Sequence, residues 1–97
     1  MYKHFKIGDH VRSFDFDTSG GQNRELTGPN ASFTEGRVID IVDQTGLPCY
    51  KILVDRRVYF GKECRVREGE LHWPPVNGLH DNLKKWPSNS VELIETA

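Results

Sequence analysis

The residues with the most evident chemistry form a basic run in the second half of the chain. Five cations and one tyrosine fall within twelve residues: Arg56, Arg57, Tyr59, Lys62, Arg65 and Arg67. If they share one face, such a cluster can contact phosphates or an acidic partner. The alternative is a solvated surface of mixed charge, because Glu63 and Glu68 interrupt the run and Asp55 precedes it. Residues 56–67 are therefore a candidate nucleic-acid site.

The two tryptophans are the other candidate binding residues. Trp73 and Trp86 are each followed by a proline, and a partly exposed tryptophan is a preferred anchor at protein interfaces. The alternative for both is a role in the core, where most tryptophans of a small domain lie. Their exposure in the folded protein decides between the two roles.

The histidines and cysteines do not have the spacing of a metal site or of a catalytic centre. Imidazole and thiolate are the usual zinc ligands, but Cys64, His72 and His80 are each eight residues apart, without a close pair. No nucleophile motif accompanies Cys64, and Gly20-Gly21 lacks the Gly-Lys-Ser/Thr ending of a phosphate loop. The sequence therefore predicts no catalytic residue, no metal, no cofactor and no small-molecule substrate. We expect that the protein is not an enzyme.

The composition fits one small folded domain over residues 1–97. Hydrophobic residues make up 36% and charged residues 28%, which is too apolar for a disordered chain. The net charge of −1 exerts no general attraction on nucleic acid or anionic lipid, so such binding requires a local patch. Because no stretch suits a signal peptide or a membrane span, we expect a cytoplasmic protein with no membrane contact. In that compartment Cys49 and Cys64 are expected to be reduced thiols.

Alternation of side chains with a period of two is the signal that organises the fold. Residues 50–55 alternate in this way, which places a mostly apolar row on one face of a strand. Residues 37–43 predict a second strand, and Gly and Pro within residues 44–48 favour an antiparallel hairpin between the two. The strand over 50–55 is expected to continue to Phe60 with a bend or bulge near Arg56, where no turn residue stands.

Shorter elements complete the prediction. The first strand is expected over residues 11–16, with a bulge near Ser13 because Val11 is out of phase with Phe14 and Phe16. Short strands are expected over 71–73 and 91–95, long loops over 17–32 and 61–69, and one or two helical turns near residues 79–86. The sequence thus predicts a mainly β fold, a small, partly open antiparallel barrel of five or six short strands.

The opening Phe5-Lys-Ile-Gly-Asp-His-Val11 resembles the start of small β-barrels of the Src-homology-3-like and KOW-like kind, in which a hydrophobic residue and Gly-Asp precede the first strand. The later order is similar too: a long loop, Glu35-Gly36-Arg37-Val38 at the next strand, a hairpin, a helical turn and the terminal Val91-Glu-Leu-Ile-Glu95. The chain also looks like small accessory proteins of phages or mobile elements. The resemblance implies binding of peptides, proteins or nucleic acids rather than catalysis. Residues 17–32 lack the aromatic pairs of the members that bind proline-rich peptides.

We therefore expect a non-catalytic binding module. Interaction with another protein or self-association is favoured, because the near-neutral charge removes general attraction to nucleic acid while ten aromatic residues and exposed strand edges offer adhesive surface. Nucleic-acid binding through residues 56–67 is the alternative.

Overall fold

The computed structural model describes residues 4–14, 24–44, 47–74, 76 and 91–97. They form six strands: β1 (His10–Ser13), β2 (Phe33–Gln44), β3 (Leu47–Tyr59), β4 (Lys62–Cys64), β5 (Leu71–His72) and β6 (Val91–Glu95). The strand order is β4-β3-β2-β1-β6, with β5 paired to β3 off this path, and every pairing is antiparallel. The predicted mainly β, antiparallel fold is confirmed, and none of the described residues is helical. Among the described strands the sheet does not close on itself, and the helical turns predicted near residues 79–86 lie outside the described residues.

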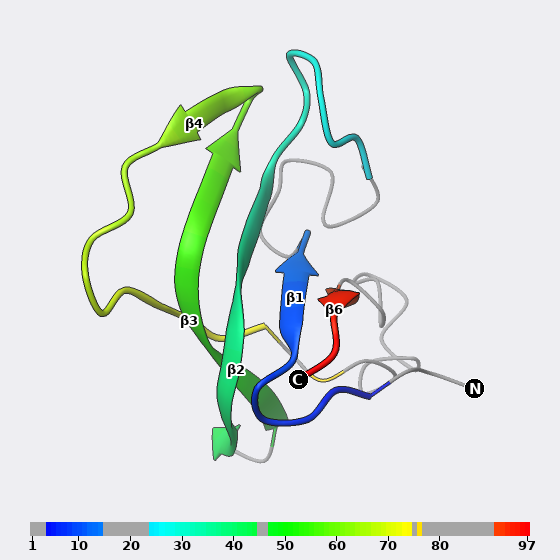
Figure 1. Ribbon diagram of the computed structural model, residues 1–97, viewed down its shortest axis with the longest axis vertical. Helices are drawn as coiled ribbons and strands as arrows, with labels where there is room; N and C mark the ends of the chain where they lie inside the picture. The colour runs from blue at the N-terminus through cyan, green and yellow to red at the C-terminus, as the bar shows by residue number, and fades with distance from the viewer. Residues whose placement is uncertain (1–3, 15–23, 45–46, 75, 77–90) are drawn as a thin grey trace.

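The long hairpin of β2 and β3 dominates the sheet (Figure 1). Its pairing runs from Phe33 opposite Val58 to Gln44 opposite Leu47, which confirms the predicted hairpin. The register shifts where Glu35 and Gly36 face Arg56 and Val54, so β3 holds one extra residue beside Arg56. The predicted bulge near Arg56 is therefore confirmed.

Strand β2 begins at residue 33, four residues before the strand that its apolar alternation predicts. The missed segment, Phe33-Thr-Glu-Gly36, carries two polar residues and a glycine. All four are buried in the folded protein, where the segment lies between β1 and β3. The sequence pattern does not reveal this burial, since buried polar residues need partners that the pattern does not identify.

Gly36 allows β2 to approach β3 closely at the bulge. A Cβ atom at this position would lie 2.2 Å from the carbonyl oxygen of Leu53 and 2.6 Å from Cγ2 of Ile52. The nearest atom belongs to the backbone, which cannot rotate away as a side chain can. Only glycine fits between the two strands here without moving one of them.

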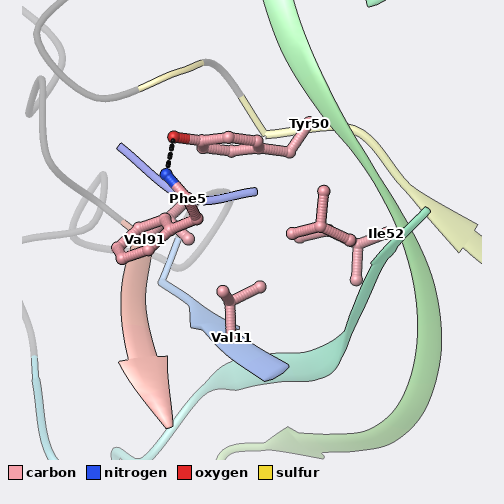
Figure 2. Packing of buried hydrophobic residues seen from close by; sticks show 6 residues of the cluster. Phe5, Val11, Tyr50, Ile52 and Val91 are labelled. Atoms are coloured by element: carbon pink, nitrogen blue, oxygen red, sulfur yellow. Dashed lines mark hydrogen bonds between the residues drawn. The ribbon is translucent and has the colours of Figure 1, made fainter. Parts of the chain in front are cut away.

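The buried side chains form two clusters on opposite faces of the sheet. The first contains Phe5, Val11, Val38, Tyr50, Ile52 and Val91 (Figure 2). The second contains Phe14, Ala31, Phe33 and Val58. Because side chains alternate between faces along a strand, Val11 belongs to one cluster and Phe14 to the other. The bulge predicted near Ser13 is wrong, since β1 pairs regularly there and its register shift lies between His10 and Val11.

Hydrogen bonds attach the segment before β1 to the sheet. The backbone N–H of Phe5 donates to the buried hydroxyl of Tyr50 at 3.1 Å (Figure 2). The carboxylate of Asp9 accepts from the backbone N–H of Lys6 at 3.0 Å and of Ala97 at 2.9 Å. These two hydrogen bonds hold the pKa of Asp9 below its usual value. Asp9 therefore connects the segment before β1 to the residues that follow β6. The predicted terminal strand over 91–95 is confirmed as β6.

Replacing Gly36 by alanine should destabilise the fold strongly. The added methyl group would overlap the backbone of β3, and we expect a loss of about 3 kcal/mol in the free energy of unfolding, measured by urea denaturation. Gly69→Ala is the control: Gly69 has a positive φ of 78° but no atom within 4 Å of the added Cβ. It should cost only about 1 kcal/mol from backbone strain. Equal losses in the two variants would contradict the close approach of β2 and β3.

Candidate functional site

The structure divides the predicted basic run into paired and unpaired cations. Nε of Arg56 donates to Glu63 at 2.7 Å, and Nη1 of Arg57 forms an ion pair with Glu70. By contrast, Lys62, Arg65 and Arg67 are exposed, and no ion pair involves their side chains among the residues that the structure describes. The run is therefore not uniform: its first two arginines are held in ion pairs, whereas its second half carries exposed cations without an ion pair to a described residue.

Alternating charges cross the sheet from one edge strand to the other. Glu92 on β6 contacts Arg12 on β1 at 2.8 Å, and Arg12 contacts Glu35 on β2 at 2.8 Å. Glu35 lies 3.5 Å from Arg56 on β3, which in turn binds Glu63 on β4. We call these five residues the charge ladder. It places two arginines beside the carboxylate of Glu35, a residue of which only 5% is exposed, and a buried carboxylate needs such partners.

The ring of Phe33 lies beneath the two arginines of the charge ladder. The guanidinium carbons of Arg12 and Arg56 lie 5.3 Å and 5.4 Å from its centroid, within the range of cation–π attraction. Phe33 in turn packs edge to face against Phe14, at 6.0 Å between centroids. The charge ladder and the second buried cluster therefore support each other. The sequence pattern does not reveal the role of Arg12, because its partners come from strands 23 and 80 residues away.

Tyr59 and Phe60 stand together at the turn between β3 and β4. Both are 45% exposed, and their rings meet at 82° with centroids 4.7 Å apart. Phe60 has a positive φ of 49° and Gly61 one of 77°, as in the tight two-residue turns that normally take Asn and Gly. The loop predicted over residues 61–69 is therefore wrong at its start, where this turn leads into β4; Gly61 after a β-rich segment was the available signal.

Trp73 lies on an outer surface of the sheet. Nζ of Lys51 is 5.3 Å from its ring centroid, and the residue is half-buried. Leu53 faces both Arg37 on β2 and Leu71 on β5, so these side chains share one side of the sheet. Trp73 is therefore part of a surface, as the interface prediction requires. Trp86, the other predicted anchor, lies outside the described residues.

His72 and Ser13 form a polar contact inside the molecule. Nε2 of His72 lies 3.2 Å from Oγ of Ser13, which is completely buried. Burial and, to a smaller extent, the positive charge of Arg57 lower the pKa of His72 to about 4, although Glu70 acts in the opposite direction. At neutral pH the imidazole is therefore uncharged. A buried serine cannot reach a substrate, so the pair has a structural role.

The other predicted chemical groups do not assemble into a site within the part of the chain that the structure describes. No group of three or more His, Cys, Asp or Glu residues there could hold a metal ion. Cys49 and Cys64 are not joined by a disulfide. No helix among these residues is long and apolar enough to cross a membrane.

Comparisons of this chain with protein-family models, with curated proteins and with solved structures gave no match. The candidate sites of this protein are therefore the surfaces described above: the exposed face around Leu53 and the tip of the β3–β4 hairpin.

Glu35 should be the most costly charge to remove. Glu35→Ala would leave two arginines without their buried partner, and we expect a loss of about 3 kcal/mol in the free energy of unfolding. The exposed Glu95 on β6 supplies a control, because Glu95→Ala should change stability by less than about 0.5 kcal/mol. Chemical denaturation of both variants measures the difference. If Glu35→Ala were as mild as the control, the charge ladder would not hold the sheet together.

The neutral, partly buried His72 should make the fold less stable in mild acid. The unfolded chain takes up a proton near the ordinary histidine pKa of 6.5, whereas the folded protein does so only near pH 4. The contribution of His72 to the free energy of unfolding is therefore fully present above pH 6.5. It is lost by at most about 1.4 kcal/mol per pH unit as the pH drops from 6.5 toward 4. Urea unfolding of the wild type and of His72→Gln, near pH 7 and near pH 5, should give the variant a smaller pH dependence. Equal pH dependence in both proteins would show that His72 titrates normally.

Proposed function

We propose that this protein is a non-catalytic binding module that associates with a second copy of itself through one outer face of the sheet. This face, which we call the Leu53 face, consists of Ile39, Lys51, Leu53, Leu71 and Trp73. The observation that carries the proposal is Leu53: it stands in the middle of the hairpin strand β3, between β2 and β5, yet is 42% exposed. A leucine in this position normally packs against a second layer, so a second molecule can supply that layer.

The neighbours of Leu53 extend the apolar surface. Ile39 is 40% exposed and stands at the register shift of β2, where it is the extra residue next to Asp40 opposite Lys51. Leu71 and Trp73 are half-buried at the side of β5. The surface thus has an apolar centre with an aromatic side chain at its border, which is the composition of protein interfaces rather than of a freely solvated strand.

The charges around the Leu53 face are balanced, which favours a second copy over a strongly charged partner. Arg37 and Lys51 supply two positive charges, and Asp40 supplies a negative one. Asp55, two residues after Leu53, supplies a second negative charge and lies 2.9 Å from Nε2 of His10. A two-fold interface brings the same patch of both subunits together, so each cation must meet a carboxylate. A patch with equal numbers of both signs satisfies this requirement.

The fold and the buried polar groups are compatible with this role. A partly open barrel of the Src-homology-3-like kind is the finer architecture that we propose, because the bulge in β3 bends the hairpin and lets β3 pair with both β4 and β5.

The absence of catalysis is likewise part of the proposal. It is supported by the enclosure of the Ser13–His72 pair, which has no exposed serine hydroxyl for a substrate.

Leu53→Asp should abolish self-association while leaving the fold intact. The added carboxylates would face each other across the two-fold interface, where like charges and lost apolar contact both oppose binding. Size-exclusion chromatography with light scattering should give a dimer mass for the wild type and a monomer mass for the variant.

Ile94→Asp is the matched control, because Ile94 is 37% exposed but stands on β6, which β2 and β1 separate from β3 in the sheet. This variant should remain dimeric. A wild type that is monomeric at concentrations up to the millimolar range, or a Leu53→Asp variant that is still dimeric, would overturn the proposal. Circular dichroism confirms that each variant retains its β structure.

A further inference from the structure

The turn between β3 and β4 holds an aromatic residue in an unfavourable backbone conformation. Phe60 has a φ of 49°, in the left-handed region where a bulky L-residue is strained and where Asn or Gly is usual. Its side chain remains 45% exposed, so the strain is not offset by burial of the ring. Strained residues of this kind concentrate at sites that bind ligands.

The turn is fixed in place by the segment before β2. The N–H of Phe60 donates to the hydroxyl of Ser32 at 3.1 Å, and the N–H of Gly61 donates to the carbonyl of Ala31 at 2.8 Å. A Cβ on Gly61 would lie 2.3 Å from the carbonyl oxygen of Gly28, so the contact between the two segments is tight. The two rings are therefore presented on a rigid support, which lowers the entropic cost of binding a ligand.

Cations that form no ion pair with a described residue follow the aromatic pair along β4 and the segment after it. Lys62 is opposite Tyr59 in the strand register, so the two side chains lie on the same side of the hairpin. Arg65 and Arg67 follow β4 and line an open hollow of about 580 Å³ together with Val66 and Glu68. Glu63 is already bound to Arg56, which leaves Glu68 as the carboxylate of this loop without an ion pair to a described residue. The loop thus has a local excess of positive charge on a protein whose net charge is −1.

We propose that the tip of the β3–β4 hairpin binds single-stranded nucleic acid, with bases stacked on Tyr59 and Phe60 and phosphates in contact with Lys62, Arg65 and Arg67. Exposed aromatic rings next to a cationic track are the combination that single strands require, because unpaired bases offer their faces for stacking. A duplex hides those faces. An acidic peptide could use the cations, but it would gain little from the rings.

This site is independent of the proposed self-association. Tyr59 stands six residues beyond Leu53 on β3, a distance of roughly 20 Å at the rise of an extended strand. A failure of the dimer experiment leaves the hairpin tip unaffected, and a failure of nucleic-acid binding leaves the Leu53 face unaffected.

Fluorescence anisotropy with labelled single-stranded oligo-dT and oligo-U, a hairpin duplex and an acidic peptide tests the proposal. The single strands should bind best. Their log affinity should fall against log salt concentration with a slope of about −2, as expected for three phosphate contacts on a single strand. Arg65→Gln should reduce the magnitude of this slope by about 0.7, whereas Lys6→Gln, an exposed cation elsewhere, should not change it.

Phe60→Asn gives the sharpest result, because function and stability should change in opposite directions. Asparagine relieves the backbone strain, so the midpoint of thermal unfolding should rise, while affinity for single strands should fall about tenfold through loss of one stacking ring. Leu26→Asn, a matched change at another exposed apolar residue, should leave affinity unchanged. Absence of salt-dependent binding, equal binding of duplex or acidic peptide, or full affinity in Phe60→Asn would each overturn the proposal.

Discussion

The buried carboxylate of Glu35 is the constraint on which the arrangement of the sheet depends. A charge that is almost completely removed from water is tolerated only if oppositely charged groups replace the lost hydration, and here Arg12 and Arg56 do so from the two neighbouring strands. A shift of either strand by one residue would turn its arginine to the other face of the sheet. The requirement to neutralise Glu35 therefore fixes the register of β1, β2 and β3 together.

Ion pairs also divide the cations of the basic run between the framework and the surface. Arg56 belongs to the charge ladder and Arg57 is held by Glu70, so both contribute to the framework rather than to a ligand site. Lys62, Arg65 and Arg67 lie beyond the hairpin turn, where their side chains form no ion pair with a carboxylate of the described residues. A basic run that is continuous in the sequence is thus divided by the fold into a structural part and a surface part.

The two proposed surfaces occupy different parts of the long strand β3. Its bulge beside Arg56 separates the part of β3 that contains Leu53 from the part that ends at Tyr59. In a dimer formed through the Leu53 face, two hairpin tips would belong to one particle. A single strand long enough to reach both tips would then bind with a raised effective concentration at the second site. Self-association and nucleic-acid binding are in this way compatible functions of one small module.

The sequence by itself determined the class of fold, the β2–β3 hairpin, the bulge near Arg56 and the terminal strand, because these follow from local alternation and from local turn residues. It also identified the residues of the basic run and Trp73 as candidates for binding. Only the tertiary structure decided which of them are paired, that Glu35 is buried, and that Val11 and Phe14 belong to separate clusters. The physical reason is distance along the chain: Arg12, Glu35 and Glu92 are far apart in sequence, and their charges act on one another only after the strands have paired.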